Sequence, residues 1–127
     1  DTSALMAIVL DEPEAAACVN ALAASESTLI SAGTVVEALL VAGGRGLGKV
    51  VEDMIDDLRL EVVPVSLAEA RRVAQGYGRW GKGRDPAGLN FGDCFAYAVA
   101  KENDCPLLFI GNDFARTDIE PVLASGG

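Results

Sequence analysis

The chain has 127 residues, of which 50% are hydrophobic and 23% are charged, and this composition predicts one folded domain with a single hydrophobic core. It contains no histidine, which excludes Ser-His-Asp and Cys-His catalysis and also histidine-ligated zinc or copper. Its net charge of −9 at first sight disfavours nucleic acid as a partner, because phosphate binding requires cations.

Short β-branched segments alternate with longer helical patterns along the chain, with neither an internal repeat nor a low-complexity linker. Helices are predicted over Ser3–Leu10, Glu12–Ala24, Thr34–Val41, Leu47–Leu58, Ser66–Gln75 and Asn90–Asn103. Strands are predicted over Thr28–Ser31, over Glu61–Val65 and Pro106–Ile110 (both buried), and at best as a short edge strand at Val122–Leu123 after Pro121. This alternation is typical of the α/β class, in which helices cover both faces of a parallel sheet.

Local signals mark how several of these elements begin and end. Asp11 is the expected N-cap of the second helix, with a proline in the first turn, and Ser66 fits a capping box with Glu69. Residues Gly76–Gly88, rich in glycine and cations, are predicted to form a loop. Residues Gly111–Asp113 are predicted to turn into a short helical segment.

A sheet of this kind calls for a strand before the first helix. We therefore expect Asp1 to be the last residue of that strand, preceded in the full protein by a few apolar residues, and residues 1–127 to form a single domain. No apolar run approaches the roughly 20 residues that span a bilayer, and no basic leader is visible. The three cysteines lack C-x-x-C spacing, so we expect a cytoplasmic protein with reduced thiols.

Four carboxylates far apart in the sequence are predicted to reach one edge of this sheet. Asp1 ends the expected first strand, and Asp113 follows the strand Pro106–Ile110. Glu37 and Asp93 lie about one turn inside their helices, where side chains lean toward the helix N-terminus and hence toward the ligand-binding ends of the strands. Carboxylates gathered in this way repel one another unless a cation joins them. All-oxygen ligation suits Mg²⁺ or Mn²⁺, which activate water for attack on a phosphate.

Each of the four acids also has a purely structural interpretation. Thr34 with Glu37, and Asn90 with Asp93, fit capping boxes, and the other two acids fit N-caps or turns. Spacing alone therefore leaves a joint metal site and separate structural roles equally open.

The residues around these acids resemble the PIN-domain family, and most of all its VapC-type toxins, the ribonuclease members of bacterial toxin–antitoxin pairs. The resemblance is carried by Asp1–Leu5 (DTSAL), Leu89–Cys94 (LNFGDC) and Leu107–Phe114 (LLFIGNDF), in the expected order over essentially the whole chain. It implies an α/β/α sandwich with a central, mainly parallel sheet, and cleavage of RNA that depends on Mg²⁺ or Mn²⁺. It also implies a homodimer and inhibition by a small cognate antitoxin. The family's catalytic and metal-binding acids fall on Asp1, Glu37, Asp93 and Asp113.

The same resemblance gives a meaning to three residues beside the acids. Ser3 matches a position whose hydroxyl lies near the metal, although it also fits the start of a helix. Asn112, inside the third matching segment, and Asp118 are candidates for outer-shell contacts, and a solvated charge is the alternative for Asp118.

Half of the 10 basic residues fall in the stretch Arg71–Arg84. We expect Arg79, Lys82 and Arg84 to contact RNA phosphates, and Tyr77 and Trp80 to stack on unpaired bases. A solvated loop is the alternative for the cations, and core packing or a dimer contact is the alternative for the aromatic residues.

Other functions remain open at this point. The apolar faces of helices 12–24, 34–41 and 47–58 either form a groove for an antitoxin helix or are buried in the protein's own core. Rival functions are a related nuclease outside a toxin–antitoxin pair, acting on DNA or structured RNA, and a non-catalytic binding module. A phosphoacceptor signalling domain is disfavoured, because no lysine lies between Gly111 and Gly127.

Overall fold

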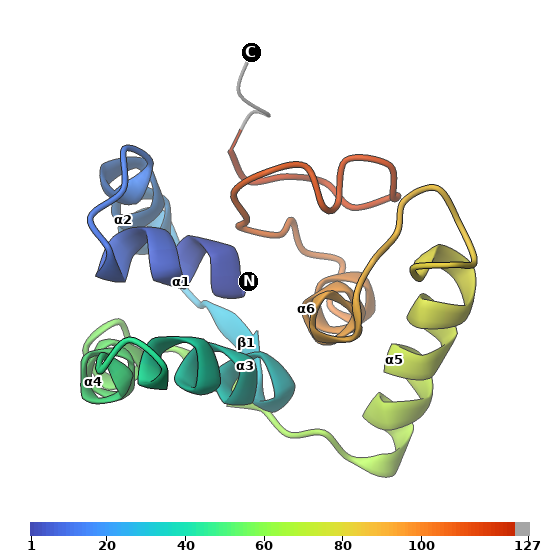
Figure 1. Cartoon of the computed structure of the whole chain (residues 1–127), viewed down its shortest axis with the longest axis horizontal. Helices are drawn as coiled ribbons and strands as arrows, with labels where there is room; N and C mark the ends of the chain where they lie inside the picture. Colours follow the sequence, from blue (N-terminus) through green and yellow to red (C-terminus); the bar gives the residue numbers. More distant parts are fainter. Residues whose placement is uncertain (124–127) are drawn as a thin grey trace.

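A computed structural model describes residues 1–123, in which helices pack around a short parallel sheet (Figure 1). The helices are α1 (Thr2–Val9), α2 (Ala15–Ala24), α3 (Ala32–Gly43), α4 (Gly48–Asp57), α5 (Leu67–Trp80) and α6 (Phe91–Glu102). Strand β1 (Leu29–Ser31) pairs in parallel with β2 (Glu61–Val63), with Leu29 opposite Glu61. The prediction of an α/β fold with a parallel sheet is confirmed.

The hydrophobic core has two parts, and α6 lies between them. One part joins α6 to α5 and to the chain that follows α6, through Val73, Leu89, Phe109 and Phe114. The other joins α1, β1, α3 and α4, where Ala38 and Val51 are fully buried. Figure 1 shows α6 between α5 on one side and β1 with α3 on the other. This position brings the start of α6 close to both halves of the molecule.

Helix α5 is longer than predicted and replaces the first part of the expected loop. It continues through Gly76 and Gly78 to Trp80, so the loop covers only residues 81–89. Gly76 is buried against Tyr97, where an added Cβ would lie 3.0 Å from the Tyr97 ring. The absence of a side chain therefore allows α5 to pack closely on α6, and this tertiary contact outweighs the low helix propensity of glycine.

The second helix also begins later than predicted, because Asp11 closes α1 instead of opening α2. Asp11 has a φ of 51°, and the next amide, that of Glu12, donates to the carbonyl of Ala7 at 2.9 Å. A left-handed residue followed by such a bond is the usual way in which a helix ends. The N-cap of α2 is Glu14.

The predicted strands are shorter or more exposed than the sequence suggested. β2 ends at Val63 and is largely exposed, so the expected buried strand over 61–65 is wrong in extent and in burial. Residues 106–110 make a single parallel bridge, between Leu107 and Pro121. Leu107 accepts from the amide of Val122 at 3.0 Å and donates to the carbonyl of Glu120 at 2.9 Å. A parallel bridge of this kind uses the carbonyl before Pro121 and the amide after it, so the missing N–H of Pro121 is not needed.

Residues 111–117 form turns, and the short helical segment predicted there is absent from this part of the described chain. None of the helices within residues 1–123 is both long and apolar enough to cross a membrane.

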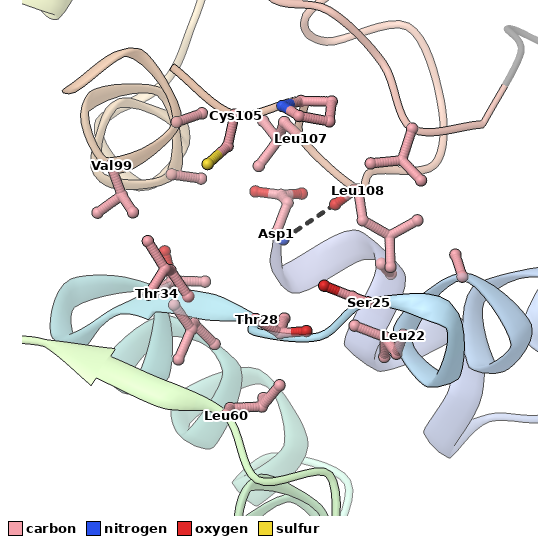
Figure 2. A pocket seen from close by; sticks show the side chains of 18 of the residues that line it. Asp1, Leu22, Ser25, Thr28, Thr34, Leu60, Val99, Cys105, Leu107 and Leu108 are labelled. Carbon is pink, nitrogen blue, oxygen red and sulfur yellow. Dashed lines mark hydrogen bonds between the residues drawn. The ribbon is translucent and has the colours of Figure 1, made fainter. Parts of the chain in front are cut away.

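A cavity of about 350 Å³ lies between β1 and the residues that follow α6 (Figure 2). Its lining is mainly apolar and includes Leu22, Leu60, Val99 and Leu107, together with the acid Asp1. The Asp1 nitrogen donates to the carbonyl of Leu108 at 3.0 Å, which joins the start of α1 to the chain after α6. An apolar lining is a poor receptor for a charged phosphate, and of the four acids only Asp1 is among the lining residues.

Candidate functional site

The side chain of Asp1 is fixed at the N-terminus of α1. One carboxylate oxygen, Oδ2, accepts from the amide of Ser3 at 3.0 Å and from the Ser3 hydroxyl at 2.7 Å. The Ser3 hydroxyl in turn accepts from the amide of Ile110 at 2.9 Å. The other oxygen of Asp1, Oδ1, is buried and has no hydrogen-bond partner. Ser3 therefore links Asp1 to the segment that leads to Asp113, and Asp1 keeps one oxygen available for a ligand.

Glu37 is held by a contact that its local sequence does not predict. Ser31, whose hydroxyl accepts from the amide of Gly33 at 3.1 Å, is the N-cap of α3. Thr34 thus lies inside the helix, and the capping-box interpretation of Thr34 with Glu37 is wrong. Instead, the Glu37 carboxylate accepts from the Thr2 hydroxyl at 2.6 Å.

Gly92 makes room for this carboxylate at the start of α6. An added Cβ on Gly92 would overlap the Glu37 carboxylate group. The glycine therefore allows Glu37, from α3, to lie directly beside the backbone that carries Asp93. Its place in the Gly-Asp-Cys motif has this steric explanation.

Asp93 is buried in the first turn of α6 and forms the predicted capping box. Its carboxylate accepts from the amide of Asn90 at 3.1 Å, while its own amide donates to the Asn90 side chain at 2.8 Å. Burial raises the pKa of Asp93 from 3.8 to about 6, with further contributions from the charges of Asp113 and Glu37 and an opposing one from the Asn90 amide. Capping and membership of an acidic group are therefore compatible at this residue.

Asp113 lies in the turns after Gly111, whose φ of 97° suits glycine. The side chains of Asn112 and Asp113 are exposed, whereas Phe114 is buried against Phe109 with ring centroids 5.0 Å apart. Phe114 thus anchors the segment in the core, and the charge of Asp113 is close enough to raise the pKa of Asp93. We refer to Asp1, Glu37, Asp93 and Asp113 as the acidic cluster.

No lysine or arginine pairs with the acidic cluster in the described part of the chain. The ion pairs found there all join other carboxylates to lysine or arginine. A buried carboxylate that no lysine or arginine pairs with is unfavourable, because burial penalises its charged form and nearby like charges repel it.

The donor set of the cluster fits a hard divalent cation such as Mg²⁺ or Mn²⁺, since every available ligand is a carboxylate oxygen and one of them, Asp1 Oδ1, is buried without a partner. As the side chains lie, no three acidic or cysteine residues among residues 1–123 converge into a closed group of metal ligands. Mg²⁺ does not require such a group, because it commonly uses one or two carboxylates and keeps several waters.

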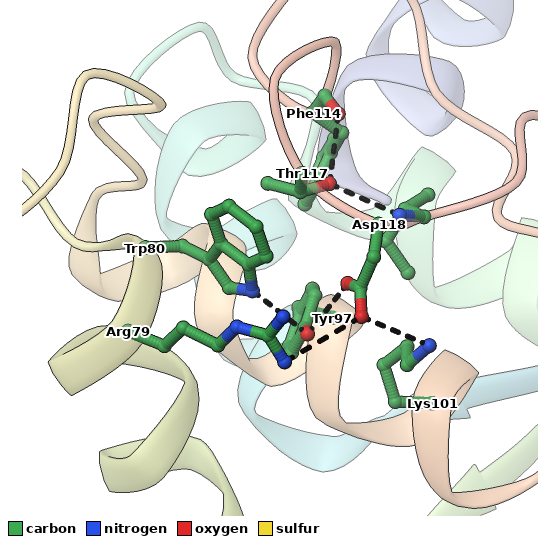
Figure 3. Close-up of polar contacts among 8 residues, drawn as sticks. Arg79, Trp80, Tyr97, Lys101, Phe114, Thr117 and Asp118 are labelled. Atoms are coloured by element: carbon green, nitrogen blue, oxygen red, sulfur yellow. Dashed lines mark hydrogen bonds and ion pairs between the residues drawn. The ribbon is translucent and has the colours of Figure 1, made fainter.

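Asp118 lies apart from the acidic cluster, in a network of its own (Figure 3). Its Oδ1 accepts from the Tyr97 hydroxyl at 2.7 Å, and its Oδ2 pairs with Lys101 at 3.1 Å and more loosely with Arg79 at 3.8 Å. The indole N–H of Trp80 donates to the Tyr97 hydroxyl at 2.9 Å. The structure therefore brings Asp118 to the middle of α6 and not beside the four acids.

The predicted RNA-binding cations fall into two groups. Lys82 and Arg84 are exposed in the loop after α5, as expected. Arg79 stacks on Trp80, with its guanidinium 4.6 Å from the ring centroid, and approaches Asp118. Trp80 packs against the core, and the Tyr77 hydroxyl donates to the carbonyl of Lys82 at 3.2 Å. Core packing is therefore the role that the structure gives to both aromatic residues.

Sequence reasoning missed Thr2, Gly92 and Tyr97. Thr2 and Gly92 contact Glu37 from distant parts of the chain, and no local pattern predicts such contacts. Tyr97 had one available signal: it lies four residues after Asp93 and four before Lys101, on one face of a helix that was predicted correctly.

Comparison with known proteins gives consistent matches over nearly the whole chain. A family model described as PIN domain matches residues 1–120. Ribonuclease VapC36 of Mycobacterium tuberculosis is 44% identical over 125 residues, covering 94% of this chain and 89% of that protein. Ribonuclease VapC28 of the same species is 38% identical over 127 residues, covering 97% and 96%. Ribonuclease VapC of Mycolicibacterium smegmatis is 41% identical over 129 residues, covering 96% and 97%.

Proposed function

This chain belongs to the PIN domain family, and from that premise we propose that it is a metal-dependent endoribonuclease that cleaves RNA phosphodiester bonds at the acidic cluster. Relatives named as ribonucleases support the substrate class. The observation that carries the proposal is the acidic cluster itself: a buried Asp93 with a raised pKa, beside other acids and not paired with a lysine or arginine. Perturbed titration of this kind is typical of functional sites.

We propose Asp1, Glu37, Asp93 and Asp113 as the catalytic and metal-binding residues. Bound Mg²⁺ or Mn²⁺ would supply Lewis acidity and a water of lowered pKa for in-line attack on a phosphate. The chain's own residues hold the ligands. Ser3 orients Asp1, Thr2 orients Glu37, and Asn90 orients Asp93. Fixed carboxylates lose little conformational freedom when they bind an ion, which favours binding.

RNA would approach across the loop after α5, where Lys82 and Arg84 are free to contact phosphates. The Arg116 guanidinium donates to the carbonyl of Pro86 at 3.4 Å and so brings a further cation from the Asp113 segment to this loop. Contacts of this kind position a strand without selecting its sequence, because they involve phosphates and not bases.

We further propose that the protein is the toxin of a type II toxin–antitoxin pair and forms a homodimer. Much of the apolar surface of α3 and α4 is buried in the protein's own core, which accounts for Ala38 and Val51. Val36 and Leu40 on α3 remain 56% and 72% exposed, however, and offer an apolar contact for a partner helix. Co-expression of the adjacent gene's product with the parent and with Leu40→Asp tests this: an equimolar complex is expected only for the parent. An adjacent gene product that associates with neither chain, under conditions where both are folded, would contradict the toxin–antitoxin role.

The proposed activity is tested by RNA cleavage with the purified chain in Mg²⁺, in Mn²⁺ and in EDTA, beside Asp93→Asn. Asparagine keeps the helix cap but removes a negative ligand, so cleavage should be lost while the circular dichroism spectrum stays native. Asp56→Asn, at an exposed position on α4, is the matched control and should cleave like the parent.

The outcome also separates the rival functions. Full activity of a folded Asp93→Asn protein would reject the acidic cluster as the catalytic centre. Cleavage of DNA in preference to single-stranded RNA would favour a related nuclease. Absence of both cleavage and Mn²⁺ binding would favour a non-catalytic binding module.

A further inference from the structure

One face of α6 carries three side chains at intervals of four residues: Asp93, Tyr97 and Lys101. Residues four apart on a helix lie one above the other. Asp118 contacts the second and the third. At the other end, Phe114, which follows Asp113, is buried in the same core cluster as Cys94, which follows Asp93. The segment from Asp113 to Asp118 therefore runs along this face, with one carboxylate at each end.

The contact at the Asp118 end is specific in direction as well as in charge. The Tyr97 hydroxyl accepts from the Trp80 indole at 2.9 Å, so its single proton is directed to Asp118, at 2.7 Å. The second carboxylate oxygen of Asp118 binds Lys101 at 3.1 Å. Tyr97 is itself buried, which fixes the position of its hydroxyl.

The Asp113 end has no comparable attachment among the described residues. Its segment is held by local turn bonds, such as those from Ala115 to Asn112 (3.0 Å) and from Thr117 to Phe114 (3.1 Å), and by the buried Phe114 ring. The Asp113 side chain is exposed, and it carries the same negative charge as Asp93. Beyond Phe114 the segment is also held by the bond from the Arg116 guanidinium to the Pro86 carbonyl at 3.4 Å and by Ile119, which is buried in the core. Asp118 is the attachment that joins the segment directly to polar side chains of α6.

We propose that Asp118 is a positioning residue, whose bonds to Tyr97 and Lys101 hold the 111–118 segment on α6 so that Asp113 stays beside Asp93. Asp118, which accepts from Tyr97 and pairs with Lys101, thereby keeps Asp113 at the other end of the segment in place. Insofar as Asp113 is a metal ligand, this inference rests on the proposed function. The contact between the segment and α6 does not.

The first test measures Mn²⁺ affinity by isothermal titration calorimetry and cleavage as a function of Mn²⁺ concentration. In Asp118→Ala we expect the dissociation constant for Mn²⁺ to rise about tenfold, with cleavage restored at saturating Mn²⁺. Asp118→Asn keeps an oxygen for the Tyr97 hydroxyl, so its affinity should lie between those of the parent and Asp118→Ala. Trp80→Phe is the matched control, because it weakens the network but leaves the Tyr97–Asp118 bond, and its Mn²⁺ affinity should equal that of the parent.

The second test needs no metal. Amide hydrogen exchange of residues 111–117 in the metal-free protein should be about tenfold faster in Asp118→Ala than in the parent, while the interior of α6 is unchanged. Parental Mn²⁺ affinity and parental exchange in the Asp118 variants would overturn the inference. If the parent itself binds no Mn²⁺, the proposed function fails, and the exchange rates alone decide whether Asp118 holds the segment. If Asp118→Ala does not fold, Asp118→Asn supports both measurements.

Discussion

Two carboxylates at α6 lie in opposite electrostatic surroundings: Asp93 belongs to the helix, and Asp118 contacts it from the following segment. At its first turn, burial and the charges of Asp113 and Glu37 raise the pKa of Asp93 to about 6. One turn further along, burial also raises the pKa of Asp118, but the hydrogen bonds of Tyr97 and Lys101 outweigh it and leave that pKa below its ordinary value. The charged form of Asp93 is therefore disfavoured, whereas the charged form of Asp118 is stabilised by its hydrogen-bond partners.

This difference separates a functional acid from a structural one on physical grounds. The chain supplies hydroxyl and ammonium donors to Asp118, and the local charge is balanced within the protein. At the acidic cluster the described chain supplies hydrogen bonds but no lysine or arginine, although both residue types are present elsewhere in the same domain. A site that keeps such an imbalance is where an external cation contributes most to stability. Four experiments test this difference between the two acids.

The largest effect is expected from Gly92→Ala, which acts on the acidic cluster without removing an acid. The added methyl group would displace the Glu37 carboxylate, so we expect cleavage of RNA to fall by about 100-fold or more, since misplacement of a catalytic group by about 1 Å costs this much. Mn²⁺ affinity should fall as well, and calorimetry measures it on the same sample.

Gly78→Ala is the matched control for this change. Gly78 lies in α5 with open space around it, so the variant should cleave normally and gain up to about 1 kcal/mol of stability from the better helix propensity of alanine. Normal cleavage by Gly92→Ala would mean that Glu37 has no part in the site.

The next effect concerns the stability of the metal-free protein against pH. Asp93 has a folded pKa of about 6 against an ordinary 3.8. As pH rises from about 4 to 6 the unfolded chain loses the proton first, so the folded state loses stability, by about 3 kcal/mol once pH exceeds 6. Urea titrations between pH 4 and 7 should show this decrease in the parent and not in Asp93→Asn.

Asp118 should behave in the opposite sense. Its folded pKa is lowered, so the stability it contributes is present above its ordinary pKa and is lost as pH falls through that range. Asp118→Asn should therefore be less stable than the parent at neutral pH, with the difference shrinking in acid.

A parent whose stability has the same pH dependence as Asp93→Asn would show that the Asp93 carboxyl is not perturbed, and the contrast between the two acids would disappear.

Metal binding should stabilise the protein through the acidic cluster alone. At Mn²⁺ one hundred times above its dissociation constant, the free energy of unfolding should rise by about 2.7 kcal/mol. Asp118→Ala, with an affinity about tenfold weaker, should gain about 1.4 kcal/mol at the same concentration, and Asp93→Asn should gain almost nothing. Thermal unfolding with and without EDTA measures all three, and an equal gain in Asp93→Asn would place the ion elsewhere.

The elements of this fold were predictable wherever a local signal decides the structure. The capping box of Asn90 and Asp93 gave the start of α6 correctly, and the α/β class followed from the alternation of patterns. Local signals misled where a distant contact decides. Gly76 suggested a loop, but its contact with Tyr97 keeps it in α5, and Asp11 suggested a helix start although it ends α1.

The same distinction applies to the candidate site. Asp93 was placed correctly at a helix start, and Asp1 takes the N-cap role that was its structural alternative, because capping is local. Glu37 was assigned a partner three residues away, whereas its actual partner, Thr2, is 35 residues away. The network of Asp118 joins residues separated by 17 to 39 positions, and no spacing rule in a single sequence selects those partners. The acids could be named in advance, but the groups that orient them could not.

The smallest effect, from Trp80→Phe, tests how far the Asp118 network is structural. Phenylalanine keeps most of the buried ring but removes the N–H that donates to the Tyr97 hydroxyl, and a single lost hydrogen bond of this kind costs about 1 kcal/mol. Urea titration should show this loss at neutral pH, with unchanged cleavage, because Tyr97 can still donate to Asp118. A large loss of cleavage at native stability would mean that Trp80 itself contacts RNA. Trp80, the last residue of α5, would then belong to the RNA-binding surface as well as to the Asp118 network.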